Sequence, residues 1–583
     1  MSAAPPPDSR NANTLWAGVL VETLVRCGVR HAAISPGSRS APLAFACAAH
    51  PGLEAISVLD ERSAGFLGLG LAKVSGRPTA LVCTSGTAAA NYLPALVEAR
   101  ESGVPLLALT SDRPPELRSC AAGQAIDQQK LYGNAVSFFH ELAMPEAREP
   151  LLRYLRQTVA HAVSRTLGPS AGPVHLNVPF RDPLPPLPDD GAVTRVAAAI
   201  DWPSFFSHLA LPQRPVKSAA WPEFAAGVRG LIVSGSAQLL RADDDVTVVA
   251  DIARRLGWPV LADGLSSLRQ HAARISRLVT TYDTILRRAE VAEDLRPEVV
   301  ICLGDWPASK VLRAWIETTD PEIWQVNERT DNRDALHGRT RFLQGDLSDW
   351  AASLPEAGET EPAYARKWMN LEVQVRAEID RRLAGEESLF EPKAVWLLGK
   401  HLPSETPLVV ANSMPVRDLE YVMPPANRGI RPWCNRGANG IDGTLSTALG
   451  VAWAANRPTV LLTGDLALLH DSNGLLLQPR FPGSLTVVLI NNRGGGIFEH
   501  LPVAQFDPPF EEFFATPQGI DFARLCAAHG VEHVLVRNWA HFTQLVAQLP
   551  GRGLRVLELP TDRQADAARR RQWFEEFAAG IRM

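Results

Sequence analysis

The chain lacks the features of membrane, secreted and nucleic-acid-binding proteins. None of its apolar runs approaches the roughly 20 residues that a helix needs to cross a bilayer. The start, MSAAPPPDSRNANT, has neither a basic region nor an apolar core, so we expect no export signal and predict a loose tail. Blocks of lysine or arginine are also missing and the formal net charge is −5. Nucleic acid is therefore not expected as the main partner.

Cysteine is scarce and scattered. No C-x-x-C pair occurs, and the positions are Cys27, Cys47, Cys83, Cys120, Cys302, Cys434 and Cys526. Neither a zinc knot nor a disulfide framework is indicated, and a reducing cytoplasm fits best. No G-x-G-x-x-G follows the first predicted strand, which disfavours a dinucleotide-binding enzyme.

Short apolar runs alternate with helical patterns along the chain. In the first part, runs at 31–34, 55–59, 79–83 and 105–109 are each followed by a polar loop or a helical stretch. This alternation predicts an α/β fold with a parallel, doubly wound sheet.

The length of 583 residues exceeds what one hydrophobic core can organise. The proline-dense segment PFRDPLPPLPDD at 179–190 is predicted to be a linker, because proline blocks helix interiors and central strands. Further strand-like runs lie at 230–234, 259–262, 299–303, 323–326, 407–411, 459–462 and 485–490. We therefore predict three consecutive α/β domains with mainly parallel sheets, spanning 1–190, 191–360 and 361–583.

Two polar strand ends in the third part form a candidate metal site. Asp465 follows the run at 459–462, and Asn492 with Gly494 follows the run at 485–490. Ligands of open α/β sheets bind at the carboxyl ends of strands. A carboxylate and an amide oxygen suit a hard cation such as Mg²⁺ that also contacts phosphate oxygens. The alternative is an ordinary βαβ unit with a polar turn.

Motifs from residue 35 to 498 together resemble the thiamin diphosphate-dependent 2-succinyl-5-enolpyruvyl-6-hydroxy-3-cyclohexene-1-carboxylate synthase family of menaquinone biosynthesis. They are SPGSRSAPL, LDERSAGF, TSGTA with DRPPEL, NSMPVR, NRGANGIDG and GDL with NNRGGGIF, in the family's order. Leu466 follows Gly464 and Asp465 at a position where related enzymes have glycine. Members of this family also accept leucine there. The resemblance implies a pyrimidine-binding first domain, a central domain and a diphosphate-binding third domain.

The same resemblance implies a transferase reaction. A family member decarboxylates 2-oxoglutarate and adds the succinyl carbanion equivalent to isochorismate in a 1,4 fashion. Glu61 matches the glutamate that activates the cofactor. The alternative for Glu61 is an exposed acid at a helix N-terminus, favoured there by the helix dipole.

Loop residues are assigned to the substrates by resemblance. The isochorismate side would use Ser38, Arg39, Arg113, Gln124 and Lys310. The side facing the 2-oxoglutarate-derived part would use Ser413, Arg417 and Arg436. Arginine suits such carboxylates because its planar fork binds them bidentately. Taken singly, each cation is better explained as a solvated surface base, and it is the placement in motif loops that favours a substrate-binding role.

The remaining assignments concern the cofactor and assembly. Ile441 matches the apolar residue that wedges under the cofactor, with a core isoleucine as the alternative. The cofactor-binding set is Glu61, Ile441, Gly464, Asp465, Asn492, Gly494, Ile497 and Phe498. Asp465, Asn492 and the Gly494 carbonyl would bind Mg²⁺ or Mn²⁺. A homodimer or homotetramer with active sites at the subunit interface is implied. Rival functions are another thiamin diphosphate-dependent decarboxylase or carboligase, and a non-catalytic cofactor-binding or scaffold protein.

Overall fold

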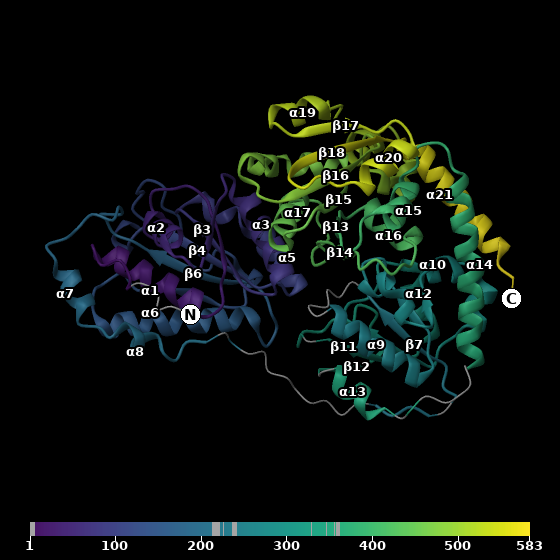
Figure 1. Cartoon of the computed structure of the whole chain (residues 1–583), viewed down its shortest axis with the longest axis horizontal. Coiled ribbons are helices and arrows are strands. Elements are labelled where there is room, and N and C mark those ends of the chain that lie inside the picture. Colours follow the sequence, from purple (N-terminus) through teal and green to yellow (C-terminus); the bar gives the residue numbers. More distant parts are fainter. Residues whose placement is uncertain are drawn as a thin grey trace. The chain divides into compact units, whose positions relative to one another are not determined.

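The computed structural model describes residues 6–210, 212, 222–225, 227–235, 242–327, 329–344, 347–354, 356 and 362–582. These residues form three six-stranded sheets in which every strand pair is parallel (Figure 1). The predicted α/β class with three mainly parallel sheets is confirmed. The predicted boundary at 360 lies outside the described residues, and the boundary at 190 stays a prediction.

By contact density the chain divides into two compact units. The first unit comprises Met1–Pro215, Asn435–Ala455 and Asp471–Pro479. The second comprises Val216–Cys434, Asn456–His470 and Arg480–Met583.

The first sheet has the strand order β2-β1-β3-β4-β6-β5. Its strands are β1 His31–Ile34, β2 Glu54–Ser57, β3 Thr79–Cys83, β4 Leu106–Asp112, β5 Phe139–Glu141 and β6 Val174–Pro179. The central strands β3 and β4 are buried throughout, as a sheet covered on both faces requires. The helices of this part are α1 Ala12–Arg26, α2 Ala41–Ala49, α3 Glu61–Ser75, α4 Thr87–Ala90, α5 Leu93–Ser102, α6 Glu149–Leu167, α7 Ala192–Ala198 and α8 Trp202–Phe206.

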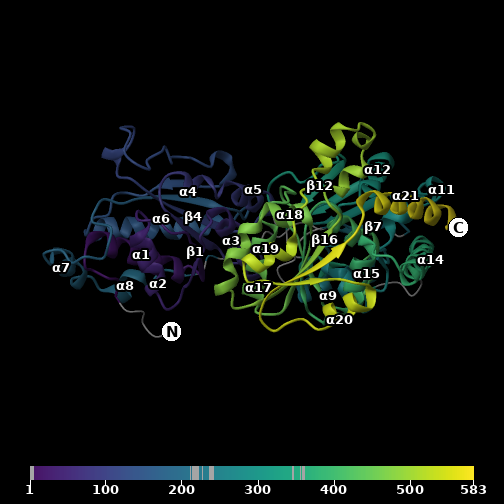
Figure 2. The same ribbon diagram turned by 90° about the horizontal axis from the view of Figure 1, so that it is seen from above.

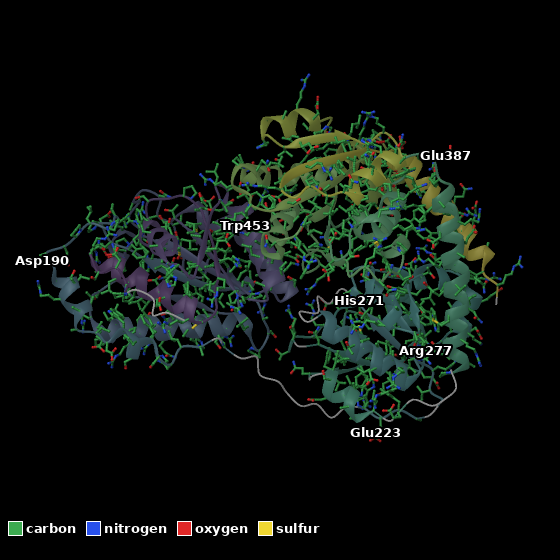
Figure 3. All side chains as sticks on the ribbon, viewed as in Figure 1. Asp190, Glu223, His271, Arg277, Glu387 and Trp453 are labelled. Carbon is green, nitrogen blue, oxygen red and sulfur yellow. The ribbon has the colours of Figure 1, made fainter. Side chains whose placement is uncertain are left out.

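Helix α17, Thr444–Ala455, also belongs to the first unit and lies side by side with α3 (Figure 1, Figure 2). Trp453 near its end, labelled in Figure 3, donates its indole N–H to the Glu54 carboxylate at 2.8 Å. Asn473 likewise donates to Asp60, the N-cap of α3, at 2.7 Å. The first unit is therefore completed by segments that lie 399 and 413 positions further along the chain than the residues they contact.

The second unit contains the other two sheets. One has the order β12-β11-β10-β7-β8-β9, with β7 Gly230–Ser234, β8 Val260–Ala262, β9 Leu278–Val279, β10 Val299–Leu303, β11 Glu322–Val326 and β12 Arg339–Leu343. The other has the order β14-β13-β15-β16-β18-β17, with β13 Pro407–Val410, β14 Arg431–Trp433, β15 Thr459–Gly464, β16 Ser484–Asn491, β17 Glu532–Leu535 and β18 Gly553–Pro560. The helices of this unit are α9 Ala242–Leu256, α10 Tyr282–Ile285, α11 Ala289–Asp294, α12 Lys310–Thr319, α13 Leu347–Ser353, α14 Ala363–Gly385, α15 Glu391–His401, α16 Met414–Val422, α18 Asp465–His470, α19 Phe522–Ala528, α20 Trp539–Ala547 and α21 Arg563–Gly580.

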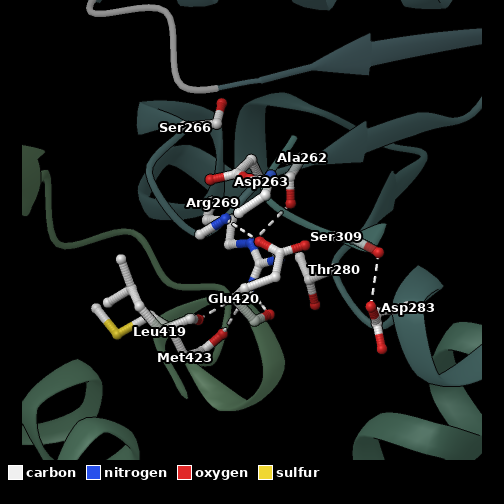
Figure 4. A network of polar contacts seen from close by, with 12 residues as sticks. Ala262, Asp263, Ser266, Arg269, Thr280, Asp283, Ser309, Leu419, Glu420 and Met423 are labelled. Atoms are coloured by element: carbon white, nitrogen blue, oxygen red, sulfur yellow. Dashed lines mark hydrogen bonds and ion pairs between the residues drawn. The ribbon is translucent and has the colours of Figure 1, made fainter. Parts of the chain in front are cut away.

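A buried polar network ties α16 to the segment that follows β8 (Figure 4). The Arg269 guanidinium donates to the carbonyl oxygens of Ala262 at 2.8 Å and Glu420 at 2.9 Å. It also forms an ion pair with the Glu420 carboxylate at 3.2 Å. Burial raises the pKa of Glu420 to about 8 against the opposing effect of Arg269. Because both side chains are fully buried, the network fixes α16 firmly.

The structure also corrects local expectations. Helix α1 begins at Ala12 with Asn11 as its N-cap, so the predicted loose tail through Thr14 is too long. The predicted linker at 179–190 is bound to this helix start, because Asn13 donates to the carbonyl oxygens of Arg181 and Pro183. Strands β6 and β18 were not expected, since buried His175 and Arg555 interrupt their apolar pattern. Within the described part of the chain, every helix is too short or too polar to cross a bilayer.

Candidate active site

Strand-end loops of the first sheet bring Arg113 and Gln124 together at Ser85. The Arg113 guanidinium donates to the Ser85 hydroxyl at 3.0 Å and to the Gly123 carbonyl at 2.8 Å. The Gln124 amide donates to the Ser85 carbonyl at 2.9 Å. Ser85, in the TSGTA motif, was not singled out from the sequence, although its place after β3 was a usable signal.

Arg39 lies in the same group of loops. Its guanidinium is buried, donates to the Phe180 carbonyl at 2.9 Å and faces the Asp182 carboxylate at 3.4 Å. Burial lowers the pKa of Arg113, and the positive charge of Arg39 lowers it further. Ser38 precedes Arg39 and is exposed. These loops therefore concentrate positive charge and hydrogen-bond donors at the carboxyl ends of β1, β3 and β4.

Glu61 is the first residue of α3. Asp60 caps this helix by accepting the Ser63 N–H at 3.0 Å. Glu61 is half-buried, and burial raises the pKa of its carboxyl, with the Asp60 charge acting in the same direction. A carboxyl that retains its proton more readily is suited to sharing a proton with a neutral heterocycle.

The loop that carries Arg436 and Ile441 is held by Glu98, a residue that lies in none of the sequence motifs. Glu98 of α5 is 3% exposed and accepts the backbone N–H groups of Gly437 at 3.0 Å and Ala438 at 2.7 Å. Lys73 lies 3.8 Å from the same carboxylate. A cavity of about 300 Å³ adjoins this loop, lined by Phe66, Leu93, Pro94, Val97, Glu98, Asn435, Ala438, Gly440 and Asp442. Arg436 and Ile441 themselves are half-buried.

In the second unit, Asp465 and Gly494 meet at the ends of β15 and β16. One Asp465 oxygen accepts the Gly494 N–H at 2.8 Å, and the other accepts the Leu466 N–H at 2.8 Å. Burial raises the pKa of Asp465 to about 6. Gly494 has φ +133°, and a Cβ there would lie 2.3 Å from the Ala515 carbonyl oxygen. Only glycine therefore fits this turn.

Asn492 has a buried oxygen atom that would suit a cation. Its Nδ2 donates to the Glu391 carboxylate at 2.6 Å. Its Oδ1 is buried and has no hydrogen-bond partner among the described residues. A buried acceptor without a donor is costly, and a cation would satisfy it. The oxygen donors of Asp465 and Asn492 therefore fit a hard divalent ion.

No group of three or more His, Cys, Asp or Glu side chains suited to a metal occurs among the residues that the structure describes. The candidate ligands proposed here include only one such side chain, the Asp465 carboxylate. The other two are the Asn492 amide oxygen and the main-chain carbonyl of Gly494. The Gly494 carbonyl accepts the Gly496 N–H at 2.9 Å and keeps a second lone pair.

Other predicted residues of the second unit lie at element ends. Ser413 is the N-cap of α16 with φ +72°, and its carbonyl accepts the Arg417 guanidinium at 2.6 Å. Gly464 ends β15. Ile497 and Phe498 are half-buried in the 3₁₀ turn Gly496–His500. Lys310 is exposed at the start of α12.

The predicted residues thus fall into two groups. The first unit holds Ser38, Arg39, Glu61, Arg113, Gln124, Arg436 and Ile441. The second unit holds Lys310, Ser413, Arg417, Gly464, Asp465, Asn492, Gly494, Ile497 and Phe498.

Family models cover most of the chain. The thiamine pyrophosphate enzyme, N-terminal TPP binding domain, matches residues 16–131. The middle domain of thiamine pyrophosphate enzymes matches residues 201–410, and the C-terminal TPP binding domain matches residues 424–558.

Individual proteins are similar over nearly their whole length. A protein of Microcystis aeruginosa named 2-succinyl-5-enolpyruvyl-6-hydroxy-3-cyclohexene-1-carboxylate synthase is 49% identical, over 97% of this chain and 99% of its own. A protein of Trichormus variabilis with the same name is 50% identical, over 98% of each chain. The solved structure of a thiamine diphosphate-dependent 4-hydroxybenzoylformate decarboxylase from Rhodococcus jostii is similar with a TM-score of 0.67. It is 16% identical and covers 94% of this chain and 99% of its own, so this likeness concerns the fold alone.

Proposed function

We propose the function of this chain from its family, since it belongs to the 2-succinyl-5-enolpyruvyl-6-hydroxy-3-cyclohexene-1-carboxylate synthases, which are thiamine pyrophosphate enzymes. The proposed reaction removes CO₂ from 2-oxoglutarate and adds the remaining succinyl carbanion equivalent to isochorismate by 1,4-addition. Thiamin diphosphate, when bound, supplies the electron sink for this carbanion.

One observation carries the proposal: the buried Asn492 Oδ1 lacks a partner among the described residues, beside the Asp465 carboxylate. Asp465, Asn492 and the Gly494 carbonyl would bind Mg²⁺ or Mn²⁺, with the diphosphate as a further ligand. Gly464, Ile497 and Phe498 would contact the same end of the cofactor.

Glu61 and Ile441 would act on the other end of the cofactor. The Glu61 carboxyl would hold a proton at the aminopyrimidine ring nitrogen, for which its raised pKa is suited. Ile441 would press against the cofactor and keep it bent. These roles are proposals that rest on family resemblance and on the half-buried position of both residues.

The anionic substrates would be bound by the cationic loops. Arg39 and Arg113, with Ser38, Gln124 and Lys310, would bind the carboxylates of isochorismate. Ser413, Arg417 and Arg436 would bind the carboxylate that 2-oxoglutarate retains. The Arg113–Ser85–Gln124 contacts support this assignment, because they orient the donors before substrate binds.

The assembly proposed is a cytoplasmic homodimer or homotetramer with active sites at the subunit interface. Sedimentation of the active enzyme tests this directly. A fully active monomer would contradict it.

The reaction is tested with the protein, thiamin diphosphate and Mg²⁺. With 2-oxoglutarate alone we expect slow CO₂ release, and with isochorismate added we expect rapid release and the succinylated product by mass spectrometry. Carbon–carbon bond formation only with pyruvate would instead indicate a different carboligase.

A further inference from the structure

Glu391 lies directly behind the candidate metal ligand Asn492. It is the first residue of α15, is 2% exposed, and accepts the Asn492 Nδ2–H at 2.6 Å. A carboxylate only accepts hydrogen bonds, so it selects the amino side of the Asn492 amide. The Asn492 Oδ1 must then point away from Glu391, and it is the atom left without a partner among the described residues.

Arg570 of α21 keeps Glu391 in this role. Its guanidinium donates to the second oxygen of Glu391 and, at 2.9 and 2.6 Å, to both oxygens of Asp418. The Glu391 backbone N–H donates to Asp566 at 3.2 Å, and the Thr561 hydroxyl donates, at 3.4 Å, to the same Glu391 oxygen that accepts from Asn492. The side chains of Glu391, Asp418 and Arg570 are all nearly fully buried. Arg570 therefore anchors the Glu391 carboxylate at the oxygen that does not contact the Asn492 amide.

We propose that Glu391 is a positioning residue of the metal site, and that its carboxylate, held by Arg570, fixes the Asn492 amide so that Oδ1 and not Nδ2 faces the cation. The inference rests on the proposed function for the presence of the cation. Ligating groups of metal sites are commonly oriented by hydrogen bonds from behind.

The variant Glu391→Gln tests whether Glu391 determines which atom of the Asn492 amide faces the cation. The new amide has one oxygen and one NH₂ group, and the buried Arg570 charge favours the oxygen on its own side. The NH₂ group then faces Asn492, which must turn its own oxygen inward. This places Asn492 Nδ2 against the cation and removes one ligand. We expect the apparent Mg²⁺ affinity to fall about 10- to 100-fold.

The second-site variant Asn492→Asp in the Glu391→Gln background is the rescue. The carboxylate introduced at position 492 can accept from the NH₂ group introduced at position 391 and still present an oxygen to the cation. We expect the double variant to recover most of the Mg²⁺ affinity. The readout is binding: Mg²⁺ is titrated into protein with thiamin diphosphate and followed by intrinsic tryptophan fluorescence and calorimetry, with no turnover involved.

Glu558→Gln is a matched control. Glu558 accepts the Nδ2–H of the neighbouring Asn491, also at 2.6 Å, but Asn491 is not a proposed ligand. We expect its Mg²⁺ affinity to stay within about twofold of wild type, since no proposed ligand is disturbed. Should Glu391→Gln fail to fold by circular dichroism, Glu391→Asp keeps the charge but withdraws it from Asn492, and a drop of about tenfold is expected.

The possible outcomes distinguish failure of the proposed function from failure of the positioning role of Glu391. Wild-type protein that binds neither thiamin diphosphate nor Mg²⁺ would overturn the proposed function. Wild-type binding with unchanged affinity in the folded Glu391 variant, or no recovery in the double variant, would overturn the positioning role alone.

Discussion

Gly70 of α3 and Gly450 of α17 face each other with no room for a side chain at either position. A Cβ on Gly70 would lie 2.2 Å from the Thr447 carbonyl oxygen, and one on Gly450 would lie 2.2 Å from the Leu67 carbonyl oxygen. The obstructing atoms are backbone atoms, which cannot rotate away as a side chain can. The two helices of the first unit therefore pack backbone against backbone.

Gly450→Ala is expected to force these helices apart. Overpacking typically destabilises a protein by about 1–3 kcal/mol, and a backbone clash lies at the upper end. The midpoint of urea unfolding should fall measurably. Gly172→Ala is the control in the same unit, because its Cβ would have no neighbour closer than 4.0 Å. Equal midpoints for both variants would contradict this packing.

Glu61→Gln is expected to retain thiamin diphosphate binding and lose nearly all turnover. The amide keeps the shape of the side chain but cannot exchange the proton that the proposed activation requires. Turnover and cofactor binding are measured on the same sample. Glu149→Gln, an acid in the first turn of α6, serves as a control for a helix-dipole role alone. Unchanged turnover in Glu61→Gln would refute the catalytic assignment.

Glu98→Gln is expected to loosen the loop that carries Arg436 and Ile441. The two N–H groups are accepted by different Glu98 oxygens, Oε1 at 3.0 Å and Oε2 at 2.7 Å, and glutamine replaces one of these oxygens by an NH₂ group that cannot accept. Leaving one of these part-buried donors facing an NH₂ group costs about 1 kcal/mol. We expect a lower melting temperature and a kcat reduced several-fold. Glu146→Gln, an exposed acid of the same unit, should leave both quantities near wild type.

His175 is expected to make the first sheet sensitive to acid. Its ring packs against Tyr132 and Phe139, and its Nε2 lies 2.7 Å from the Thr110 hydroxyl. That hydroxyl donates to Asn177, so Nε2 carries the hydrogen, while Nδ1 is buried without a partner in the described part of the chain. Burial lowers the pKa of His175 to about 3.

The sign of this effect follows from proton binding. Below about pH 6.5 the unfolded chain takes up a proton at this histidine that the folded chain refuses, so stability falls as the pH falls. Between about pH 7 and pH 5 the loss is about 2 kcal/mol. In His175→Gln this contribution is absent, so its unfolding midpoint should change less with pH than that of wild type. Parallel pH profiles for the two proteins would contradict the assignment.

The sequence by itself determined the fold class and the strand-end loops. Apolar runs such as Thr79–Cys83 are local patterns, so the three parallel sheets could be predicted from them. The positions of Asp465 and Asn492 at strand ends followed from the same runs. Strands β6 and β18 were missed, because buried polar residues break the pattern that identifies a strand.

Only the tertiary structure decided which residues support the candidate site. Glu391 and Asn492 are separated by 101 positions, and Glu98 and Gly437 by 339. A glutamate at a helix start or on a helix face has no local signature that distinguishes it from a solvated one. Its role is set by the donor that the fold places against it, and hydrogen bonds over such separations exist only once the sheets have assembled.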